Sequence, residues 1–470
     1  MPSLRLVKRD PDKAYVSSML WLPKRLIPIE AIKAGLQYWD VERGSSVLKT
    51  LWKETQDHLI CPREFIKPEQ YQNFPFPFVD VTPRRFSKAN FFVKNQPRDD
   101  DQRAANAAFN VSPGGILNLA CGKGKTFLSL KQAEFLGCPL LVVVHNTFLM
   151  NQWVNEAIPE HVELRPNDKI GIIQGDKFDW KRPITVAMIH SLAARAEAGK
   201  IPPEMREHFG MVVYDEVHHL SAPVFCQTAP LIPGRRYGLT ATDKRGDGTD
   251  FIYKMHIGDI FYSDLRQKIF PRIYFQYTPI SINLDREEVK DKNGELHIGK
   301  LKGFVGTLPD SNAFRAKCIQ TALDSGRKVL AVSHSKDQLY ALHEMFPESG
   351  LIVQETPQED RSTIVKKSRI TFAIANLGFE GLDDNSLDTV HVLLPFGSSN
   401  SPPNDLQQLM GRIQREREGK STPVMVIYDD VSIKPLHATC MVMRKQLSSW
   451  DKHIPGMPAL SFQNLNAPKL

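Results

Sequence analysis

Residues Leu119-Ala-Cys-Gly-Lys-Gly-Lys125-Thr126 lie between an apolar stretch at 116–120 and a helical pattern at 125–136. The stretch predicts a short buried strand and the pattern predicts a helix, so the quoted residues form the turn that joins them. Gly122 and Gly124 allow this turn to be tight and to direct its N–H groups toward phosphate oxygens. The N-terminus of the helix adds a partial positive charge. The sequence therefore predicts a phosphate-binding loop in an α/β sheet.

The side chains of this loop fit a bound nucleotide. Lys125 is placed to reach β- and γ-phosphates, and Thr126 is placed to hold Mg²⁺. Further contacts to the nucleotide are expected from the rest of the loop, which comprises Cys121, Gly122, Lys123 and Gly124. The usual motif has glycine where this chain has Leu119, and Gly-Lys-Thr also occurs by chance. The loop alone therefore leaves an ordinary turn as the alternative.

A second motif follows an apolar stretch at 211–214, where the chain continues as Asp215-Glu216-Val-His218-His219. A strand that ends in Asp-Glu places two carboxylates at the carboxyl edge of a sheet. We expect Asp215 to hold Mg²⁺ and Glu216 to position and polarise an attacking water. The alternative is a solvated strand end before a helix. Because the motif follows the phosphate loop within one α/β region, an ATP-hydrolysing site is favoured.

Apolar runs alternate with helical patterns in two regions of the chain. In the first region the apolar runs lie at 116–120, 140–144, 184–189 and 211–214, with helices expected at 125–136 and 148–157. In the second region the runs lie at 329–332, 371–375, 389–394 and 424–428. This rhythm is typical of α/β folds with parallel sheets.

The remaining segments have other patterns. Residues 1–95 mix apolar and basic side chains, with a helix expected near 28–38 and a Pro- and Phe-rich stretch at 74–92. At 270–308 two β-like runs, 273–282 and 295–305, flank Asn293-Gly294, which is a signal for a hairpin turn. We therefore expect a β-hairpin there. The C-terminal residues predict a helix and then a polar tail.

Composition and cysteine spacing argue against secreted, disulfide-rich, membrane-spanning and disordered classes of protein. The 470 residues are 41% hydrophobic and 24% charged, which is typical of a globular protein. The six cysteines have neither C-x-x-C nor metal-ligand spacing, so they predict free thiols in a reducing compartment. Neither a signal region nor an apolar run near 18 residues is present, which predicts a cytoplasmic protein with no membrane partner. The net charge of +7 permits binding to a polyanion.

Two more motifs add detail to the predicted ATP-hydrolysing site. Leu239-Thr-Ala-Thr242 follows the Asp-Glu segment, and Gln408-Leu-Met-Gly-Arg412-Ile-Gln-Arg415 lies in the second region. Arg412 and Arg415 are three residues apart, which places them on one face of a helix. Such a pair suits the γ-phosphate charge of a transition state, as an arginine finger does. The alternative is a solvated basic face of a charged helix.

The order of these motifs resembles that of superfamily 2 helicases with a DExH box, over roughly residues 98–430. The matching segments are 120–126, 145–153, 215–218, 239–242, 373–383 and 408–415. Details such as Leu-x-Cys-Gly-x-Gly-Lys and Asn-x-x-Leu-x-x-Gln-Trp are most similar to the XPB branch and to UvsW-like enzymes. Within that group, the chain most resembles phage-encoded branch-migration (fork-remodelling) DNA helicases.

The resemblance implies an α/β fold of two tandem RecA-like domains with parallel sheets, plus a smaller N-terminal α+β domain and a β-hairpin insertion. ATP would bind in the cleft between the RecA-like domains. The expected domains are an N-terminal accessory domain at 1–95, a first RecA-like domain at 96–265, the linker and hairpin at 266–309, a second RecA-like domain at 310–435, and a C-terminal helix and tail at 436–470.

The resemblance also assigns roles to individual residues. Gln102 would read adenine, Gln408 would lie near the γ-phosphate, and His218 would couple the Asp-Glu motif to the arginine motif. Contacts with nucleotide in the second region would come from Glu380, Gly381 and Asp383. Contacts with DNA, or coupling of DNA to the ATP site, would come from His145, Gln152, Trp153, Thr240, Thr242 and Asn376. Asn376 stands where the family usually has threonine.

The implied activity is that of an ATP- and Mg²⁺-dependent DNA helicase or translocase. It would unwind or remodel single-stranded, forked or branched DNA by branch migration or fork reversal, as a monomer, in replication, recombination or repair. A phage-encoded enzyme would work in the host cytoplasm. The alternatives are an RNA helicase, and an ATP-gated nucleic-acid clamp or subunit of a larger complex. The N-terminal domain or the expected hairpin could wedge a duplex, although a solvated surface hairpin is an equal alternative.

Overall fold

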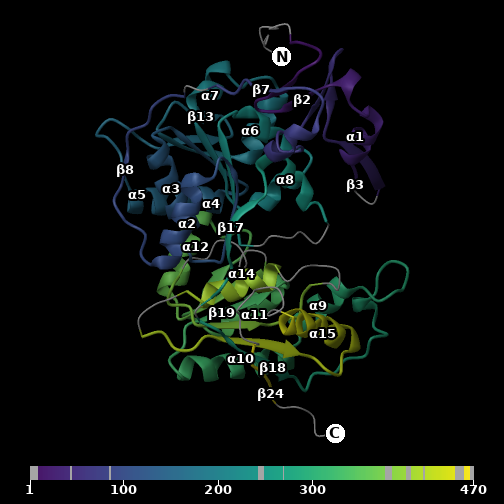
Figure 1. Ribbon diagram of the computed structural model, residues 1–470. Helices are drawn as coiled ribbons and strands as arrows, with labels where there is room; N and C mark the ends of the chain where they lie inside the picture. Colours follow the sequence, from purple (N-terminus) through teal and green to yellow (C-terminus); the bar gives the residue numbers. More distant parts are fainter. Residues whose placement is uncertain are drawn as a thin grey trace. The chain divides into compact units, whose positions relative to one another are not determined.

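The computed structural model describes residues 9–42, 45–83, 86–241, 248–267, 269–375, 384–397, 404–415, 419–449 and 460–465. The chain divides into two compact units. The first comprises Met1–Leu119 and Lys123–Asp264, and the second comprises Ala120–Gly122 and Leu265–Leu470. Each unit contains its own parallel β-sheet (Figure 1). Within the described ranges, the helices are too short or too polar to cross a membrane.

The first unit contains an eight-stranded sheet in the order β13-β12-β14-β10-β15-β16-β9-β17. All neighbours are parallel except β12 and β13. The strands are β9 (Gly115–Leu119), β10 (Leu140–Val144), β12 (Gly171–Gln174), β13 (Lys177–Asp179), β14 (Ile184–Met188), β15 (Met211–Tyr214), β16 (Arg235–Thr240) and β17 (Ile260–Asp264). The central strands are buried on both faces, as expected for runs without polar alternation.

Helices cover both faces of this sheet (Figure 1). The first face is covered by α2 (Asp100–Val111), α3 (Lys125–Leu136), α4 (Thr147–Asn151) and α5 (Ile158–His161). The other is covered by α6 (Ile189–Glu197), α7 (Pro203–His208) and α8 (Asp250–Ile257). A six-residue π-helical segment, Gln152–Ala157, joins α4 to α5, so the predicted helix at 148–157 is present but irregular.

The N-terminal part has its own mixed sheet in the order β5-β6-β2-β1-β7, together with an antiparallel ribbon of β3 and β4. Its elements are β1 (Ala14–Val16), β2 (Leu20–Pro23), α1 (Ile29–Gly35), β3 (Gln37–Glu42), β4 (Ser45–Thr50), β5 (Lys53–Glu54), β6 (His58–Cys61) and β7 (Phe78–Asp80). A further short pair is formed by β8 (Phe92–Val93) and β11 (Val162–Glu163). The N-terminal core includes Cys226 and Ile252, so it is continuous with the rest of the first unit.

The second unit contains a seven-stranded sheet in the order β20-β21-β19-β22-β23-β18-β24, with every pairing parallel. The strands are β18 (Arg272–Tyr277), β19 (Val329–Ser333), β20 (Gly350–Ile352), β21 (Ile370–Ile374), β22 (Thr389–Val392), β23 (Val424–Asp429) and β24 (Phe462–Leu465). One face is covered by α10 (Pro309–Asp324) and α11 (Lys336–Met345), and the other by α12 (Gln358–Lys367), α14 (Asn404–Ile413) and α15 (Lys434–Ser448).

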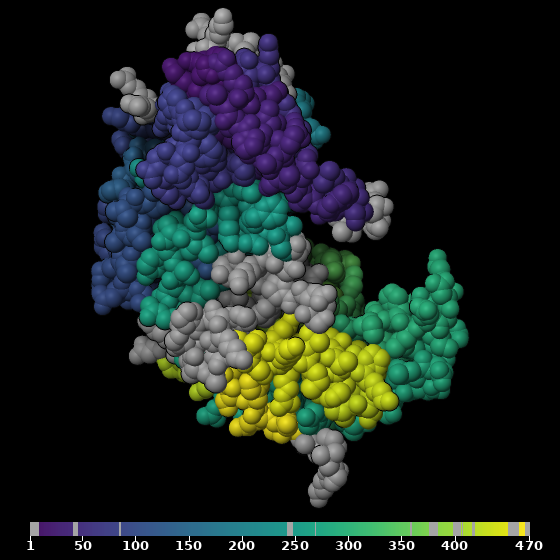
Figure 2. Space-filling model, turned by 45° about the vertical axis from the view of Figure 1, so that its right-hand side comes forward, coloured from purple at the N-terminus to yellow at the C-terminus, as the bar shows by residue number. Residues whose placement is uncertain are grey.

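The expected β-hairpin at 270–308 is wrong. Its first run is β18, which pairs with β23 and β24 inside the second sheet. Its second run is largely the helix α9 (Ile298–Thr307), because Leu301 and Val305 are four residues apart and pack into one small core. Only the bridge between Lys290 and Leu296 remains of the hairpin. The segment around this bridge stands out from the second unit (Figure 2, teal-green at the right).

A buried ion pair ties together several elements of the second unit. Arg315 on α10 and Asp430 after β23 are both fully buried, and one guanidinium nitrogen donates to both carboxylate oxygens at 2.8 and 3.1 Å. The same guanidinium donates to the carbonyl oxygens of Leu393 and Ser311. Thr278 donates its hydroxyl hydrogen to Asp430. Every charged atom of the pair therefore has a partner.

We expect Arg315→Ala to lower the free energy of unfolding by about 3–5 kcal/mol, because it leaves the Asp430 carboxylate buried without its cation. Denaturant unfolding measures the change. A matched control is Lys336→Ala, which breaks the exposed ion pair with Glu355 and should leave the midpoint nearly unchanged. Equal effects of the two substitutions would contradict this interpretation.

A buried arginine also joins several segments of the first unit. Arg236 on β16 is fully buried and donates to the carbonyl oxygens of Ser18, Ile232 and His256. The His256 side chain lies beside it, and within the described part of the chain neither of its ring nitrogens has a hydrogen-bond partner. Burial, with a smaller contribution from Arg236, lowers the pKa of His256 to about 3. His256 is therefore neutral in the folded protein.

This neutral histidine predicts a pH dependence of stability. Below the pKa of an unfolded histidine, about 6.5, the unfolded chain binds a proton that the folded chain does not. Stability is therefore lost as the pH falls from 6.5, with a slope of up to about 1.4 kcal/mol per pH unit. We expect His256→Phe to reduce this slope in denaturant titrations between about pH 6.5 and 5.

The variant should keep the contribution of His391, which is buried in the second unit and whose pKa burial also lowers to about 3. An unchanged slope in His256→Phe would show that His256 does not carry the effect.

Candidate functional site

Three strands of the first sheet end at the same edge. In the register, Thr240 of β16 lies opposite Asn118 of β9, and Gly238 of β16 lies opposite Tyr214 of β15. Because these strands are parallel, their carboxyl ends meet at one edge. The loop that follows β9 and the Asp215-Glu216 pair that follows β15 therefore leave the sheet on the same side, as the sequence predicts.

The loop after β9 has the backbone of a phosphate cradle. Gly122 and Gly124 have φ angles of +79° and +82°, a conformation that favours glycine. Gly124 is the residue before α3, so the N-terminal N–H groups of this 12-residue helix follow the turn directly. The ammonium group of Lys125 donates to the carbonyl oxygen of Leu119 at 2.7 Å. Thr126 lies in the first turn of α3.

Gln102 supports this loop from α2. Its side chain is 6% exposed, accepts the N–H of Arg98 at 3.0 Å and donates to the carbonyl oxygen of Lys123 at 3.2 Å. The ammonium group of Lys123 pairs with the carboxylates of Asp264 and Asp101. Both partners were missing from the sequence analysis, because nothing in their spacing relates them to the loop. The charge of Lys123 is thus balanced within the protein, and its backbone is the part left to face a phosphate.

Asp215 and Glu216 are held in a specific geometry. The indole N–H of Trp153 donates to Oδ2 of Asp215 at 2.8 Å, and the N–H of Glu216 donates to Oδ1 at 3.1 Å. Desolvation, followed by the neighbouring Glu216 carboxylate, raises the pKa of Asp215, while Trp153 and Lys125 oppose the shift. Glu216 has a φ of 48° and is the one non-glycine residue with positive φ within the described ranges. Strain of this kind is concentrated at functional sites.

Three histidines lie beside the two carboxylates. Nδ1 of His218 lies 3.6 Å from a carboxylate oxygen of Glu216. His219 stacks on His145 with ring centroids 3.6 Å apart, and the rings of His218 and His219 are 4.3 Å apart. His219 follows the Asp-Glu motif in the sequence, but its spacing alone predicts no role for it. The stack connects the segment after β10, which contains His145, to the segment after β15.

Two of the residues expected to contact DNA are buried. Trp153 is 1% exposed, since its ring fills the core between the helices and the sheet while its N–H reaches Asp215. Thr240 is fully buried inside β16. Neither side chain meets solvent in this conformation, so a role in direct contact with a nucleic-acid backbone, or in coupling DNA to the ATP site, stays a prediction for both. His145, which follows β10, and Gln152, which begins the π-helical segment, are half-buried and remain candidates.

In the second unit, Gln408 and Arg412 lie on α14 and are half-buried. Because α14 ends at Ile413, Arg415 lies beyond the helix, and the expectation that both arginines share one helix face is wrong. Several predicted site residues lie outside the described residues, namely Thr242, Asn376, Glu380, Gly381 and Asp383.

The residues present fit a nucleotide with Mg²⁺. A Cβ atom at Gly124 would overlap the side-chain nitrogen of Gln102, so the close approach of Gln102 to the loop requires glycine at position 124. No group of three or more metal-binding side chains occurs among the residues that the structure describes. Mg²⁺ keeps several waters and takes one or two carboxylates together with phosphate oxygens. Asp215 and the hydroxyl of Thr126 are the protein groups that would hold it.

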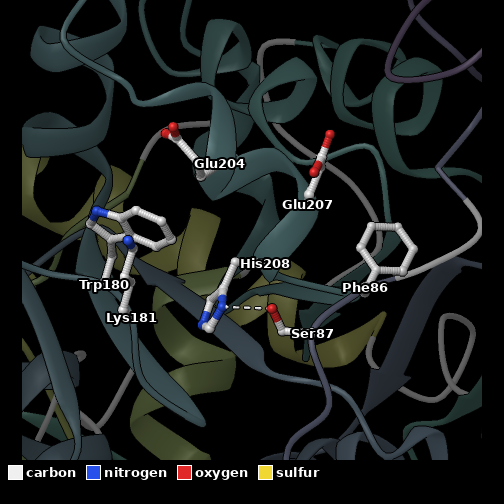
Figure 3. Close-up of a pocket in the computed structure, with 7 residues that line it drawn as sticks. All are labelled: Phe86, Ser87, Trp180, Lys181, Glu204, Glu207 and His208. Carbon is white, nitrogen blue, oxygen red and sulfur yellow. Dashed lines mark hydrogen bonds between the residues drawn. The ribbon is translucent and has the colours of Figure 1, made fainter.

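The first unit also contains a cavity of about 480 Å³ (Figure 3). It is lined by Phe86, Ser87, Trp180, Lys181, Glu204, Glu207 and His208. The ring of His208 contacts the hydroxyl of Ser87 and the carbonyl oxygen of Arg182, each at 3.1 Å. Burial lowers the pKa of His208, so the neutral ring is favoured. None of the predicted site residues lines this cavity, so it plays no part in the candidate site.

Comparison with known proteins finds a family model that matches part of the chain and several relatives named as helicases or translocases. Residues 94–245 match the family model described as the res subunit of type III restriction enzymes. A mimivirus protein named as an ATP-dependent RNA helicase is 27% identical over 68% of this chain and 60% of its own length. The DNA 3'-5' translocase XPB2 of Sulfurisphaera tokodaii is 28% identical over 60% of this chain and 59% of its own. A protein of Escherichia phage T5 named as a helicase is 28% identical over 66% of each.

The chain thus spans about three fifths to two thirds of the length of these relatives. The comparisons confirm the resemblance to superfamily 2 helicases, including XPB-like and phage or viral members. The matched residues 94–245 contain both the phosphate loop and the Asp-Glu motif.

Solved structures confirm the fold. Yeast Dbp5 bound to RNA and ADP BeF3 matches with a TM-score of 0.54 at 12% identity, over 79% of this chain and 91% of its own. A fragment of an HsdR subunit of a type I restriction enzyme from Vibrio vulnificus matches with a TM-score of 0.53 at 15% identity, over 79% and 69%. The fold is therefore α/β, with two tandem RecA-like domains and parallel sheets.

The structural role of Gly124, which precedes α3, can be tested by comparison with Gly137, which follows the same helix. Gly137 also has a positive φ, +60°, but a Cβ there would contact nothing within 4 Å. We expect Gly137→Ala to lower the free energy of unfolding by about 1–2 kcal/mol through backbone strain alone. Gly124→Ala should cost about 1 kcal/mol more, because the new Cβ displaces Gln102 from the carbonyl oxygen of Lys123. Thermal or denaturant unfolding measures both changes.

The same comparison in a Gln102→Ala background provides the control. There the excess cost of Gly124→Ala should vanish, and a persistent excess would contradict the role given to Gln102.

Proposed function

We propose that the protein is an ATP-driven DNA helicase or translocase. The observation that supports this most directly is the common sheet edge. It bears a glycine cradle before α3 and, after β15, the Asp215-Glu216 pair. A phosphate-binding turn combined with a carboxylate for Mg²⁺ and a second carboxylate for water is the arrangement that phosphoryl transfer to water requires.

Different residues of the first unit would bind the phosphates, hold Mg²⁺, activate the water and contact the adenine. Lys125 would leave the carbonyl oxygen of Leu119 and bind the β- and γ-phosphates, while Thr126 and Asp215 would hold Mg²⁺. Bound Mg²⁺ would neutralise charge on the phosphate oxygens. Glu216 would accept a hydrogen bond from the attacking water and polarise it, and its constrained backbone limits the positions that this carboxylate can take. Gln102 would contact the adenine from its place beside the loop.

We propose that residues of the second unit complete the charge balance of the reaction. Arg412 and Arg415 would neutralise charge that develops on the γ-phosphate, and Gln408 would lie near it. His218 would respond to that state through its contact with Glu216. The nucleotide contacts proposed for the second region involve Glu380, Gly381 and Asp383.

The proposed substrate is single-stranded, forked or branched DNA. One relative is named as a DNA 3'-5' translocase, which supports DNA as the substrate. Another belongs to a phage, which supports a role in a phage process. His145 and Gln152, with Thr242 and Asn376, would face the strand. Contacts to phosphates would make binding largely independent of sequence and sensitive to salt. The proposed outcome is branch migration or fork reversal in replication, recombination or repair.

RNA is the second candidate substrate. The mimivirus relative is named as an RNA helicase, and its match covers the largest share of this chain among the relatives described above. The same hydrolytic residues would serve either nucleic acid, so the two proposals differ in the polymer that stimulates hydrolysis.

We expect ATP hydrolysis by the purified protein to rise with single-stranded, forked and four-way DNA, and most with branched DNA. Glu216→Gln should lower the stimulated rate by about 10²–10⁴-fold, because the amide cannot accept a proton from water. Steady-state hydrolysis with each polymer, including RNA, measures this. Strand displacement on a forked duplex tests for movement.

Glu216→Gln should melt at the same temperature as the parent chain, since the backbone conformation at residue 216 is unchanged. Stimulation by RNA alone would replace the DNA proposal with the RNA proposal. Hydrolysis that no nucleic acid raises would contradict both.

A further inference from the structure

Trp153 lies where the helix after β10 changes its form. The π-helical segment Gln152–Ala157 interrupts an otherwise α-helical run, and the N–H of Ile158 donates to the carbonyl oxygen of Trp153, five residues back. Wide turns of this kind accommodate one additional residue and occur often at functional sites. Here the widened turn coincides with the residue whose side chain points into the core. Its ring is 1% exposed.

The indole N–H of Trp153 reaches a functional carboxylate. It donates to Oδ2 of Asp215 at 2.8 Å, a normal hydrogen-bond distance. Oδ1 of the same carboxylate accepts the N–H of Glu216 at 3.1 Å. Two donors on different oxygens fix the plane of the carboxylate, whereas a single donor would leave it free to rotate. The remaining lone pairs of Asp215 then have defined directions.

Hydrophobic packing alone does not account for this geometry. A tryptophan that only fills space requires some acceptor for its N–H, and a backbone carbonyl would serve. Here the acceptor is the carboxylate, which lies 62 residues further along the chain and on a different element. The contact therefore joins the helix after β10 to the end of β15.

We infer that Trp153 is a positioning residue: its indole N–H orients the carboxylate of Asp215 so that a lone pair of that carboxylate faces a divalent cation beside the phosphate loop. The inference rests on the proposed function, because it assumes that Asp215 is a ligand of Mg²⁺. Donors that hold a metal ligand in place typically change metal affinity about 10–100-fold when they are removed.

The test substitutes the donor while keeping an aromatic ring. Trp153→Phe removes the N–H, and Trp180→Phe is the matched control. Trp180 is also a largely buried tryptophan of the first unit, but it lines the separate cavity. The first readout is the Mg²⁺ concentration that half-saturates binding of a fluorescent ATP analogue. Trp153→Phe should raise it about tenfold, and Trp180→Phe should leave it within about twofold.

A second readout needs no nucleotide. In a double-mutant cycle of unfolding free energies with Asp215→Ala, Trp153→Phe and the double variant, residues in contact show a coupling energy and independent residues add. The cycle with Trp180→Phe should be additive. A Mg²⁺ midpoint that is unchanged in Trp153→Phe, or an additive cycle, would overturn the inference.

A third readout remains if Trp153→Phe does not fold. The chain has six tryptophans, and ¹⁵N labelling of their indoles gives a small set of resonances. In Asp215→Ala, one slowly exchanging indole N–H should shift and exchange faster. If none of the indole resonances responds, the inference is wrong.

These outcomes separate the inference from the proposed function. Absence of hydrolysis in the parent chain would refute the function while leaving the coupling between Trp153 and Asp215 measurable. Normal hydrolysis and stimulation in the parent, with no response of Mg²⁺ binding to Trp153→Phe, would refute the inference alone.

Discussion

The parallel register of β15, β16 and β9 is the constraint on which the candidate site depends. β16 lies between the other two strands and pairs with both, so the end of β15 and the end of β9 are fixed relative to each other. A slip of one residue would turn every side chain to the opposite face. The side chains at the end of β15 would then point to the opposite face of the sheet from the one they now occupy. Burial of all three strands on both faces specifies the register.

The candidate site also contains several locally unfavourable conformations and environments, which the surrounding fold stabilises. Glu216 is held in a left-handed backbone conformation, Asp215 is a desolvated carboxylate, and Gly124 has a positive φ with Gln102 packed where a Cβ would lie. Each feature lowers stability when considered alone. Together they fix groups in advance, so that little reorganisation remains when a nucleotide binds. Trp153 and Gln102 belong to the same group of residues. The side-chain N–H of Trp153 donates to Asp215, and that of Gln102 donates to the carbonyl oxygen of Lys123.

Much of the architecture could be predicted from the residues. The predicted strands at 140–144 and 211–214 coincide with β10 and β15, because continuous apolar runs of this length are typical of parallel strands buried on both faces. The phosphate loop was predictable because its glycines, lysine and threonine are adjacent in the sequence. The expected hairpin failed because Asn293-Gly294 suggested a turn between strands, while the spacing of Leu301 and Val305 is that of a helix.

Other features could not be predicted, since they depend on residues far apart in the chain. Trp153 follows a glutamine in a motif that suggested contact with DNA, and only the fold brings its N–H to Asp215. The burial of Arg315 against Asp430 requires two elements separated by more than a hundred residues. Charged residues are read as exposed in a single sequence, because their partners are invisible there. Contacts of this kind need the tertiary structure.

The carbonyl oxygens around Arg236 have a consequence for the order of events during synthesis. They come from residues 18, 232 and 256, so this cationic side chain lacks its full set of acceptors until residue 256 has left the ribosome. Domains usually fold as units, and the N-terminal one folds first. In this chain the earliest strands, β1 and β2, must wait for α8, which shares their core, before their apolar side chains are sealed. The apolar side chains of the nascent N-terminal sheet therefore stay partly exposed until α8 has been synthesised.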